Sequence, residues 1–140
     1  MIDFEKKLNK LENVISFKDI FDAYGKDFKV LCLHPLPENF IDYYFWKLKP
    51  FGLERTQTLS PYLLTKYDAS LNWYLMSKTQ ELSEAQIEAH AAYVNWNWIS
   101  LCQKLSYEFL VKWKSKIRIE SLELNKKIDP NIIILFKKLK

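Results

Sequence analysis

Nucleophilic chemistry would need one of the two histidines, His34 or His90, beside a cysteine, Cys32 or Cys102, or beside a serine. A thiol nucleophile needs a nearby histidine as its base. Cys32 and His34 are two residues apart, but the rigid Pro-Leu-Pro segment 35–37 follows them, and we interpret the pair as a junction between a cap and the core. No group of His, Cys and Asp has zinc spacing, and the two glycines have no phosphate-loop spacing. We therefore predict no catalytic residue, no metal site, no cofactor and no enzyme activity.

The composition indicates which elements would have to position any functional side chain. The 140 residues are 49% hydrophobic, which suffices for one compact domain with its own core. Two glycines and five prolines are few for a protein with many tight turns, and the content of Leu, Lys, Glu, Ile and Ala favours helices. We expect an all-α fold. Two distant cysteines make no disulfide framework, so they indicate free thiols in a reducing compartment.

The N-terminal segment and the charge bear on location and partners. Residues 1–10 carry charges where a signal peptide needs an apolar core, and no apolar run reaches the roughly 18 residues that span a membrane. We expect a cytoplasmic protein with no membrane contact. The net charge of +4 is concentrated in residues 105–140, which contain nine Lys and Arg against four Asp and Glu. Such a surface could attract phosphates or an acidic protein, or it could be a solvated helix face.

A tandem repeat is the strongest signal in the chain. The stretches 71-LNWYLMSKTQELS-83 and 94-VNWNWISLCQKLS-106 align at a spacing of 23 residues. The same spacing places four leucines in one column: Leu36, Leu59, Leu82 and Leu105. It divides the chain into four copies: 36–58, 59–81, 82–104 and 105–127. A partial fifth copy begins at Ile128.

Each copy is predicted to be two short helices joined by a turn. One column holds residues that favour the N-cap of a helix: Ser60, Ser83, Ser106 and Asp129. Asn72 and Asn95 can cap the second helix in the same way. Helices shorter than about 12 residues rarely persist alone in water, so successive copies must stack. We predict a short α-solenoid over 36–140 that ends in a C-terminal capping helix, with 1–35 as an N-terminal helical cap, in one compact domain overall.

The N-terminal cap segment has weaker signals. Residues 3–15 have helical spacing. Ser16 can cap a second short helix that ends at Tyr24, because Gly25 is a typical helix stop. The segment 28–33 could be a strand or a buried turn of helix.

Two further columns have both a packing and a binding interpretation. Rings recur at Tyr44, Tyr67, His90 and Trp113. They could stack nucleic-acid bases, but their place on the predicted first helices favours the core. Amides recur at Gln57, Gln80 and Gln103 and favour a structural ladder between adjacent backbones over a ligand site. Trp73 and Trp96 are expected in the core, whereas Trp98 stands in a varying column and is either local packing or an exposed contact.

The repeat register resembles a known type of viral repeat. Leu-Ser-x-x-Phe/Leu-Ile/Leu, then Val/Leu-Asn-Trp, then Ile/Met-Ser-x-x-Gln is similar to a short tandem helical repeat of bacteriophage and large DNA virus proteins. The match covers 36–127 and is best in the second and third copies. The outer copies depart from it, with Pro50 and Ile119 in the Trp column and Glu54 and Glu123 in the Ser column. The resemblance implies a viral origin and a helical repeat scaffold, and it carries no catalytic motif.

Two binding functions follow from these observations. In the favoured one, the protein binds and inhibits or redirects a host protein in the host cytoplasm, for example a defence enzyme such as a CRISPR or restriction nuclease. Positions that differ between copies would contact that partner: Tyr62, Lys66, Tyr74, Lys78, Asn97, Trp98, Lys112 and Glu120. The alternative is a nucleic-acid-binding helical repeat that uses Lys112, Lys114, Lys116, Arg118, Lys126 and Lys127. Acidic residues in the third copy would interrupt a phosphate track, which favours the protein partner.

Overall fold

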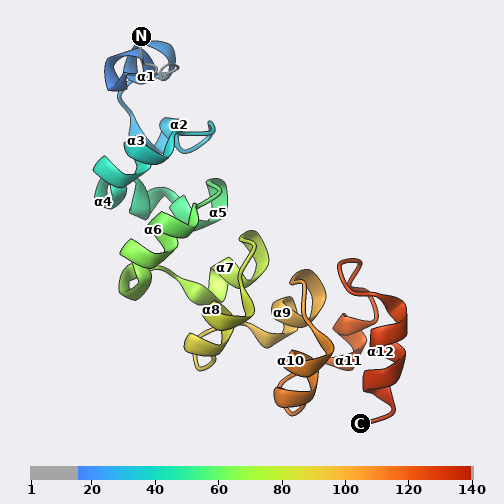
Figure 1. The fold of residues 1–140 in the computed structure, drawn as a ribbon. Coiled ribbons are helices and arrows are strands. Elements are labelled where there is room, and N and C mark those ends of the chain that lie inside the picture. Colours follow the sequence, from blue (N-terminus) through green and yellow to red (C-terminus); the bar gives the residue numbers. More distant parts are fainter. Residues whose placement is uncertain (1–15, 140) are drawn as a thin grey trace. The chain divides into compact units, whose positions relative to one another are not determined.

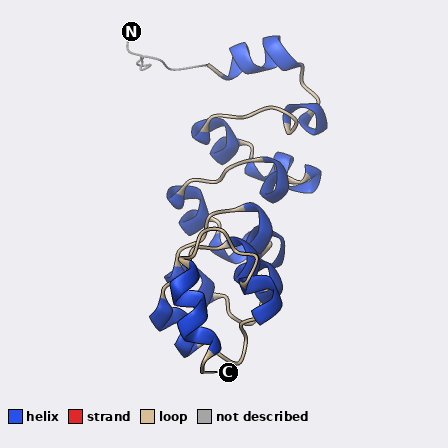
Figure 2. Ribbon diagram, turned by 90° about the vertical axis from the view of Figure 1, so that its right-hand side faces the viewer, coloured by secondary structure: helices blue, strands red, loops and turns tan. Residues whose placement is uncertain are grey.

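The computed structural model describes residues 16–139, and this part of the chain is helical and contains no strand (Figure 1, Figure 2). The all-α prediction is therefore confirmed, while the helix predicted for 3–15 lies outside the described residues. The described residues form two compact units, one up to Ala69 and one from Ser70 onward, which we call unit 1 and unit 2. None of the helices between residues 16 and 139 combines the length and the apolar character needed to cross a membrane.

Five helices begin at intervals of 23 residues: α3 (Glu38–Tyr43), α6 (Pro61–Lys66), α8 (Glu84–Ala89), α10 (Tyr107–Lys112) and α12 (Pro130–Lys137). The predicted N-cap residues explain four of these starts. The side chains of Ser60, Ser83, Ser106 and Asp129 each accept a hydrogen bond from an amide of the following first turn. The first helix of the series, α3, begins after Pro37 and has no side-chain cap.

A second series of helices also begins at intervals of 23 residues: α7 (Trp73–Thr79), α9 (Trp96–Cys102) and α11 (Ile119–Leu122). Asn72 and Asn95 cap α7 and α9 through their side chains, as the sequence predicted. Arg118 stands at the N-cap of α11 and provides no side-chain cap. The short 3-10 helix η2 (Asp68–Ser70) precedes α7.

The first copy, residues 36–58, departs from the predicted helix-turn-helix. Its second half is broken into α4 (Phe45–Leu48), the 3-10 helix η1 (Lys49–Phe51) and α5 (Leu53–Thr56). Two residues account for the breaks. Pro50 supplies no backbone N–H for a continuous helix, and Gly52 adopts a left-handed conformation with φ of 82° and ψ of 36°.

The segment before the repeats forms two helices, α1 (Phe17–Tyr24) and α2 (Phe28–Leu31). Ser16 makes a capping box with Asp19, and the N–H of Gly25 closes α1 on the carbonyl of Phe21. The segment 28–33 therefore begins as helix, which settles the choice left open between strand and helix. An aromatic cluster joins α1 and α2 to the first copy, and it consists of Phe17, Phe21, Phe28, Phe40 and Tyr44.

In unit 2, helices that occupy the same position in successive copies lie side by side. Helix α9 contacts both α7 and α11, and α10 contacts α12 (Figure 1). The apolar columns of the repeat form the core beneath them: Leu71, Val94, Ile117, Leu82, Leu105, Ile128, Ile87, Leu110 and Ile133 are all buried. A solenoid that runs through the whole chain stays a prediction.

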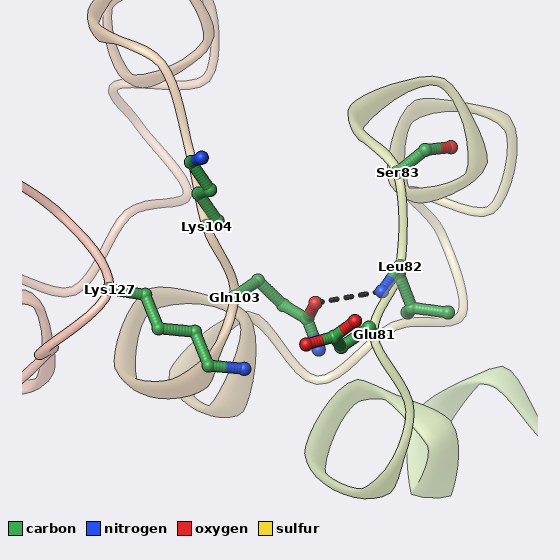
Figure 3. Close-up of a pocket in the computed structure, with 6 residues that line it drawn as sticks. All are labelled: Glu81, Leu82, Ser83, Gln103, Lys104 and Lys127. Carbon is green, nitrogen blue, oxygen red and sulfur yellow. Dashed lines mark hydrogen bonds between the residues drawn. The ribbon is translucent and has the colours of Figure 1, made fainter. Parts of the chain in front are cut away.

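The amide column ties adjacent copies together within each unit. Gln103 Nε2 donates to the carbonyls of Ser77 and Gln80 at 2.9 and 2.7 Å, and its Oε1 accepts from the Leu82 amide at 2.9 Å (Figure 3). In unit 1, Gln57 makes the same three bonds, to the carbonyls of Cys32 and His34 and from the amide of Leu36. Both side chains are buried. The glutamine column is thus a structural ladder. Its side chains hydrogen-bond the backbone amides and carbonyls of the extended linkers that precede the first helix of a copy.

In the fourth copy the side-chain amide lies one residue before the column of Gln57, Gln80 and Gln103. Asn125, and not residue 126, donates through Nδ2 to the carbonyls of Ser100 and Gln103, both at 2.8 Å. Its Oδ1 accepts from the amide of Lys127, two residues later in the same linker, at 2.8 Å. An asparagine side chain is one methylene shorter than a glutamine side chain, so the oxygen bonds its own linker and not that of the preceding copy.

A second polar column links the second helices. Ser77 Oγ donates to the carbonyl of Trp73 at 2.8 Å and accepts from the amide of Asn95 at 2.9 Å. One copy later, Ser100 Oγ donates to Trp96 at 2.7 Å and accepts from Arg118 at 3.0 Å. Each buried hydroxyl therefore joins its own helix to the N-cap of the next second helix. The sequence identified the column but not this pairing.

We predict that Gln103→Leu lowers the free energy of unfolding by about 3 kcal/mol, because one buried amide and two carbonyls lose their partner. Gln103→Glu keeps the shape but has no donor at neutral pH, so it should destabilise similarly and recover in part when the carboxyl is protonated. Urea unfolding followed by circular dichroism measures both. Lys104→Ala, at the exposed neighbouring position, should change the value by under about 0.5 kcal/mol. A loss below about 1 kcal/mol in Gln103→Leu would show that the ladder is dispensable.

Candidate partner-binding surface

The eight predicted partner-binding residues are distributed over both units. Tyr62 and Lys66 belong to unit 1. The other six belong to unit 2: Tyr74, Lys78, Asn97, Trp98, Lys112 and Glu120. Seven of the eight are exposed and Trp98 is half-buried. Several of these side chains also bond a neighbouring copy, which the sequence did not indicate.

In unit 1, three side chains converge on the carboxylate of Asp42, which lies on α3. Lys66 Nζ is 2.8 Å from Asp42 Oδ1, and the Tyr67 hydroxyl donates to the same oxygen at 2.6 Å. The Tyr62 hydroxyl donates to Asp42 Oδ2 at 3.0 Å. Tyr62 and Lys66 therefore join the second copy to the first, and their polar ends are already engaged.

These contacts shift the pKa of each partner in the direction that keeps Asp42 charged. The hydrogen bond from Lys66, followed by that from Tyr67, holds the pKa of Asp42 below its ordinary value. The bond to Asp42 in turn raises the pKa of Lys66. Burial, and then the bond to the Asp42 carboxylate, raises the pKa of Tyr67. The cluster is consequently ionised as an Asp–Lys pair with a neutral tyrosine at neutral pH.

Unit 2 repeats this arrangement at the same repeat positions, two copies later. Glu88 on α8 lies in the column of Asp42. Lys112 Nζ is 3.0 Å from Glu88 Oε2, and the indole Nε1 of Trp113 donates to that oxygen at 3.0 Å. The bond from Trp113, followed by that from Lys112, lowers the pKa of Glu88. Lys112 thus already pairs with a carboxylate of the neighbouring copy.

Exposed aromatic rings surround the Asp42 cluster. Trp46 on α4 is 64% exposed, and its ring lies edge-on to the ring of Tyr67 with centroids 6.3 Å apart. Tyr62, which itself donates to Asp42, is 51% exposed. Tyr43, beside Asp42 on α3, is 72% exposed. We call Tyr43, Trp46 and Tyr62 the unit 1 aromatic surface.

Trp46 and Tyr43 were missed as partner-binding candidates, although a signal for both existed. The column of Trp46 otherwise holds only small residues: Ala69, Ala92 and Ser115. The column of Tyr43 holds Lys66, Ala89 and Lys112. A ring that appears in one copy only does not serve the shared framework. If residues in columns that vary between copies are taken as candidate partner contacts, and the turn positions are included, the sequence identifies Trp46.

In unit 2, Trp98 combines local packing with partial exposure. Lys78 Nζ lies 4.7 Å from the centre of its ring, in a cation–π contact between α7 and α9. The hydroxyl of Ser121 donates to the side chain of Asn97, which links α9 to α11. Tyr74, at 61% exposure, projects from α7. Tyr74 is therefore the more accessible anchor in this unit.

The ring column is a packing feature in both units. Tyr67 stacks on Phe45 with centroids 3.7 Å apart, and His90 stacks on Trp73 at 3.6 Å. Trp113 lies 5.3 Å from Trp96. Each ring thus contacts an aromatic residue from the preceding copy, which leaves little face for stacking a base. Trp73 is buried as expected, whereas Trp96 is only half-buried.

The residues that could do nucleophilic chemistry are built into the packing. Cys32 is buried, its Sγ lies 3.8 Å from the carbonyl oxygen of Leu48, and burial raises the pKa of the thiol. A reactive cysteine needs the opposite shift. His34 stacks on Tyr24 at 3.9 Å. Among the residues that the structure describes, no cluster of three or more His, Cys, Asp or Glu could hold a metal ion.

Three of the six predicted nucleic-acid ligands line pockets of unit 2. Lys116 and Arg118 line a pocket beside the turn after α10. Lys127 lines two other pockets, together with Lys104, and Figure 3 shows the Lys104 side chain directed away from Glu81. Lys112 is paired with Glu88. This pairing engages one of the six cations with a carboxylate of the same unit, which disfavours a phosphate track that includes Lys112.

We predict that Asp42→Asn lowers the free energy of unfolding by about 1 kcal/mol at pH 7, since a carboxylate that accepts three bonds is lost. The folded-state pKa of Asp42 lies below the unfolded value of about 3.9. The stabilisation is therefore full above that value and disappears as the pH falls through the folded-state pKa. Urea unfolding at a series of pH values should show the variant and the parent converging below about pH 4.

Asp22→Asn is the matched control for this prediction. Asp22 pairs with Lys18 at 2.7 Å, and its side chain is 61% exposed. An exposed pair of this kind should contribute under about 0.5 kcal/mol at any pH. Equal effects of the two substitutions would contradict a special role for the Asp42 cluster.

Comparisons with protein-family models, with curated proteins and with solved structures find no match to this chain. The geometry of the chain itself is therefore the basis for the function proposed below.

Proposed function

We propose that the chain is an α-solenoid of 23-residue repeats that binds a protein partner through residues that differ between copies. The observation that carries the proposal is the exposure of large rings at such positions, above all Trp46 at 64% and Tyr43 at 72%. Aromatic residues dominate the hot spots of protein interfaces. The shared columns are occupied by packing and hydrogen bonds, so the varying columns are the ones left to bind.

The resemblance to repeats of bacteriophages and large DNA viruses supports a host protein as the partner. In this proposal the protein inhibits or redirects a host enzyme, such as a CRISPR or restriction nuclease, by covering part of its surface. The role is one of binding and not of catalysis, since Cys32 is buried with a raised pKa and His34 stacks on Tyr24. The unit 1 aromatic surface is the principal contact.

Nucleic acid is the second candidate, and its support is the charge of unit 2. Residues 70–140 contain eleven Lys and Arg against seven Asp and Glu. Binding through these charges would be sequence-independent and would weaken steeply with salt. The pairing of Lys112 with Glu88 ranks it second, because that cation is already engaged by a carboxylate.

The test begins with an affinity pull-down from host lysate treated with nuclease, followed by binding measurements with the purified captured protein. We expect Trp46→Ala to weaken that complex by about 30-fold or more, because the loss of a central aromatic anchor costs about 2 kcal/mol. The free energy of unfolding should change by under about 0.5 kcal/mol, since the ring is mostly exposed.

Lys47→Ala is the control, because Lys47 is exposed and adjoins Trp46 on α4. It should leave affinity within about threefold of the parent. A captured protein whose affinity is insensitive to Trp46→Ala and Tyr62→Ala would refute the unit 1 aromatic surface as the principal contact. Loss of all capture after nuclease treatment, with binding that collapses between low and physiological salt, would favour nucleic acid.

A further inference from the structure

A pocket of about 540 Å³ lies in unit 2 beside the turn that joins α10 to α11. Trp96 of the preceding copy contributes to its lining, and the turn contributes Ser115, Lys116 and Arg118. Glu120 is the one acidic residue that lines it. The pocket is therefore shared by two copies and offers one aromatic wall with two cations.

The turn carries three cations in this copy and none at the corresponding positions of the second and third copies, while the first copy has Lys47 and Lys49 there. Lys114, Lys116 and Arg118 alternate along residues 113–118, with no acidic residue among them. In the third copy the corresponding residues are Ala91, Tyr93 and Asn95. The framework of the repeat therefore does not require positive charge at these positions.

Arg118 replaces a residue that the framework uses elsewhere. Asn72 and Asn95 cap their helices through the side chain, whereas Arg118 provides no such cap. The loss of an asparagine cap destabilises a helix, because an amide of the first turn loses its acceptor. The chain therefore carries a cation at a position where stability favours asparagine, which is a pattern expected of a binding residue.

The two cations are available to a ligand. Both Lys116 and Arg118 are exposed, and neither forms an ion pair within the described part of unit 2. Trp96 offers apolar surface without an unsatisfied donor, because its Nε1 donates to the carbonyl of Ala91 at 3.1 Å. Its ring is held by Trp113 at 5.3 Å and remains half-buried. The wall is thus fixed in place while part of the indole stays accessible.

We propose that this pocket binds an acidic segment of a protein partner, with a carboxylate paired to Lys116 and Arg118 and an adjoining apolar side chain against Trp96. The guanidinium of Arg118 can hold a carboxylate through two parallel hydrogen bonds. Glu120 opposes the ligand and limits its affinity. The inference rests on the proposed function only in assigning the ligand to a protein.

A peptide fits the pocket better than a nucleic acid does. Single-stranded nucleic acid binds by stacking successive bases over a cationic groove. Here one partly covered ring stands beside two cations, and Lys127 lines other pockets. A peptide carboxylate with an apolar neighbouring side chain needs only a cationic group and an apolar surface, and the pocket provides both.

The experiment uses the full chain and three fluorescein-labelled probes of equal length: a peptide of glutamate and leucine, the same peptide with glutamine for glutamate, and oligothymidine. Fluorescence anisotropy at low and physiological salt measures binding. We expect the glutamate peptide to bind, and the double substitution Lys116→Gln with Arg118→Gln to weaken it by about tenfold or more. Glu120→Gln should strengthen it by about two- to fivefold, since a repulsive charge is removed.

Lys126→Gln with Lys138→Gln removes two exposed charges of the same unit outside this pocket. It should change peptide affinity by under about threefold. An equal effect of the two double variants would show that the peptide is bound by the net charge of the protein and not by this pocket, and it would overturn the proposal. Binding of the glutamine peptide as tightly as the glutamate peptide, or no binding of the glutamate peptide at all, would also overturn it.

Oligothymidine that binds more tightly than the glutamate peptide, and loses affinity in Lys116→Gln with Arg118→Gln, would assign the pocket to nucleic acid and overturn the peptide proposal. The probes need no host protein, and Trp46→Ala should leave their binding unchanged. Failure of this proposal is therefore distinguishable from failure of the unit 1 aromatic surface as the main partner contact.

Discussion

Buried linkers between very short helices impose the constraint on which the rest of this structure depends. The described α-helices are four to eight residues long, too short to persist alone. The extended segments between them carry backbone amides and carbonyls that must be hydrogen-bonded when they are covered. Side-chain amides meet that need: Gln57, Gln103 and Asn125 each bond two carbonyls and one amide. The helices can pack because these linkers are satisfied.

Because of this constraint, some columns of the 23-residue repeat are occupied by packing and backbone hydrogen bonds, whereas other columns vary between copies. Columns that carry the amides, the linking serines and the stacked rings are used in packing and hydrogen bonds, as Gln103, Ser77 and Tyr67 show. His90 on Trp73 shows how an aromatic residue is used in such a column. Trp46 shows the opposite case, since it stands in a column of small residues and is mostly exposed. Exposure of a large ring outside the framework is the basis on which we propose a binding position here.

Departures from the repeat have local structural consequences. Pro50 and Gly52 divide the second half of the first copy into three short helices. Glu54, in the column of the linking serines, is 3% exposed and pairs with Lys49 Nζ at 2.7 Å, so a buried carboxylate in an ion pair stands where the second and third copies have a hydroxyl. Arg118 gives up a helix cap in the fourth copy. The outer copies are where the sequence resemblance is weakest, and they are also where the local geometry changes.

The sequence by itself determined the helical class, the helix starts at Ser60, Ser83, Ser106 and Asp129, and the buried apolar columns. Capping and hydrophobic periodicity act over a few residues, so a single chain reveals them. It also identified the glutamine column as a ladder. Only the tertiary structure decided which side chains meet between copies: that Lys112 pairs with Glu88, that Lys78 covers Trp98, and that Trp46 remains exposed. These contacts depend on how far and at what angle one copy is displaced from the next, and no local pattern in the sequence encodes that displacement.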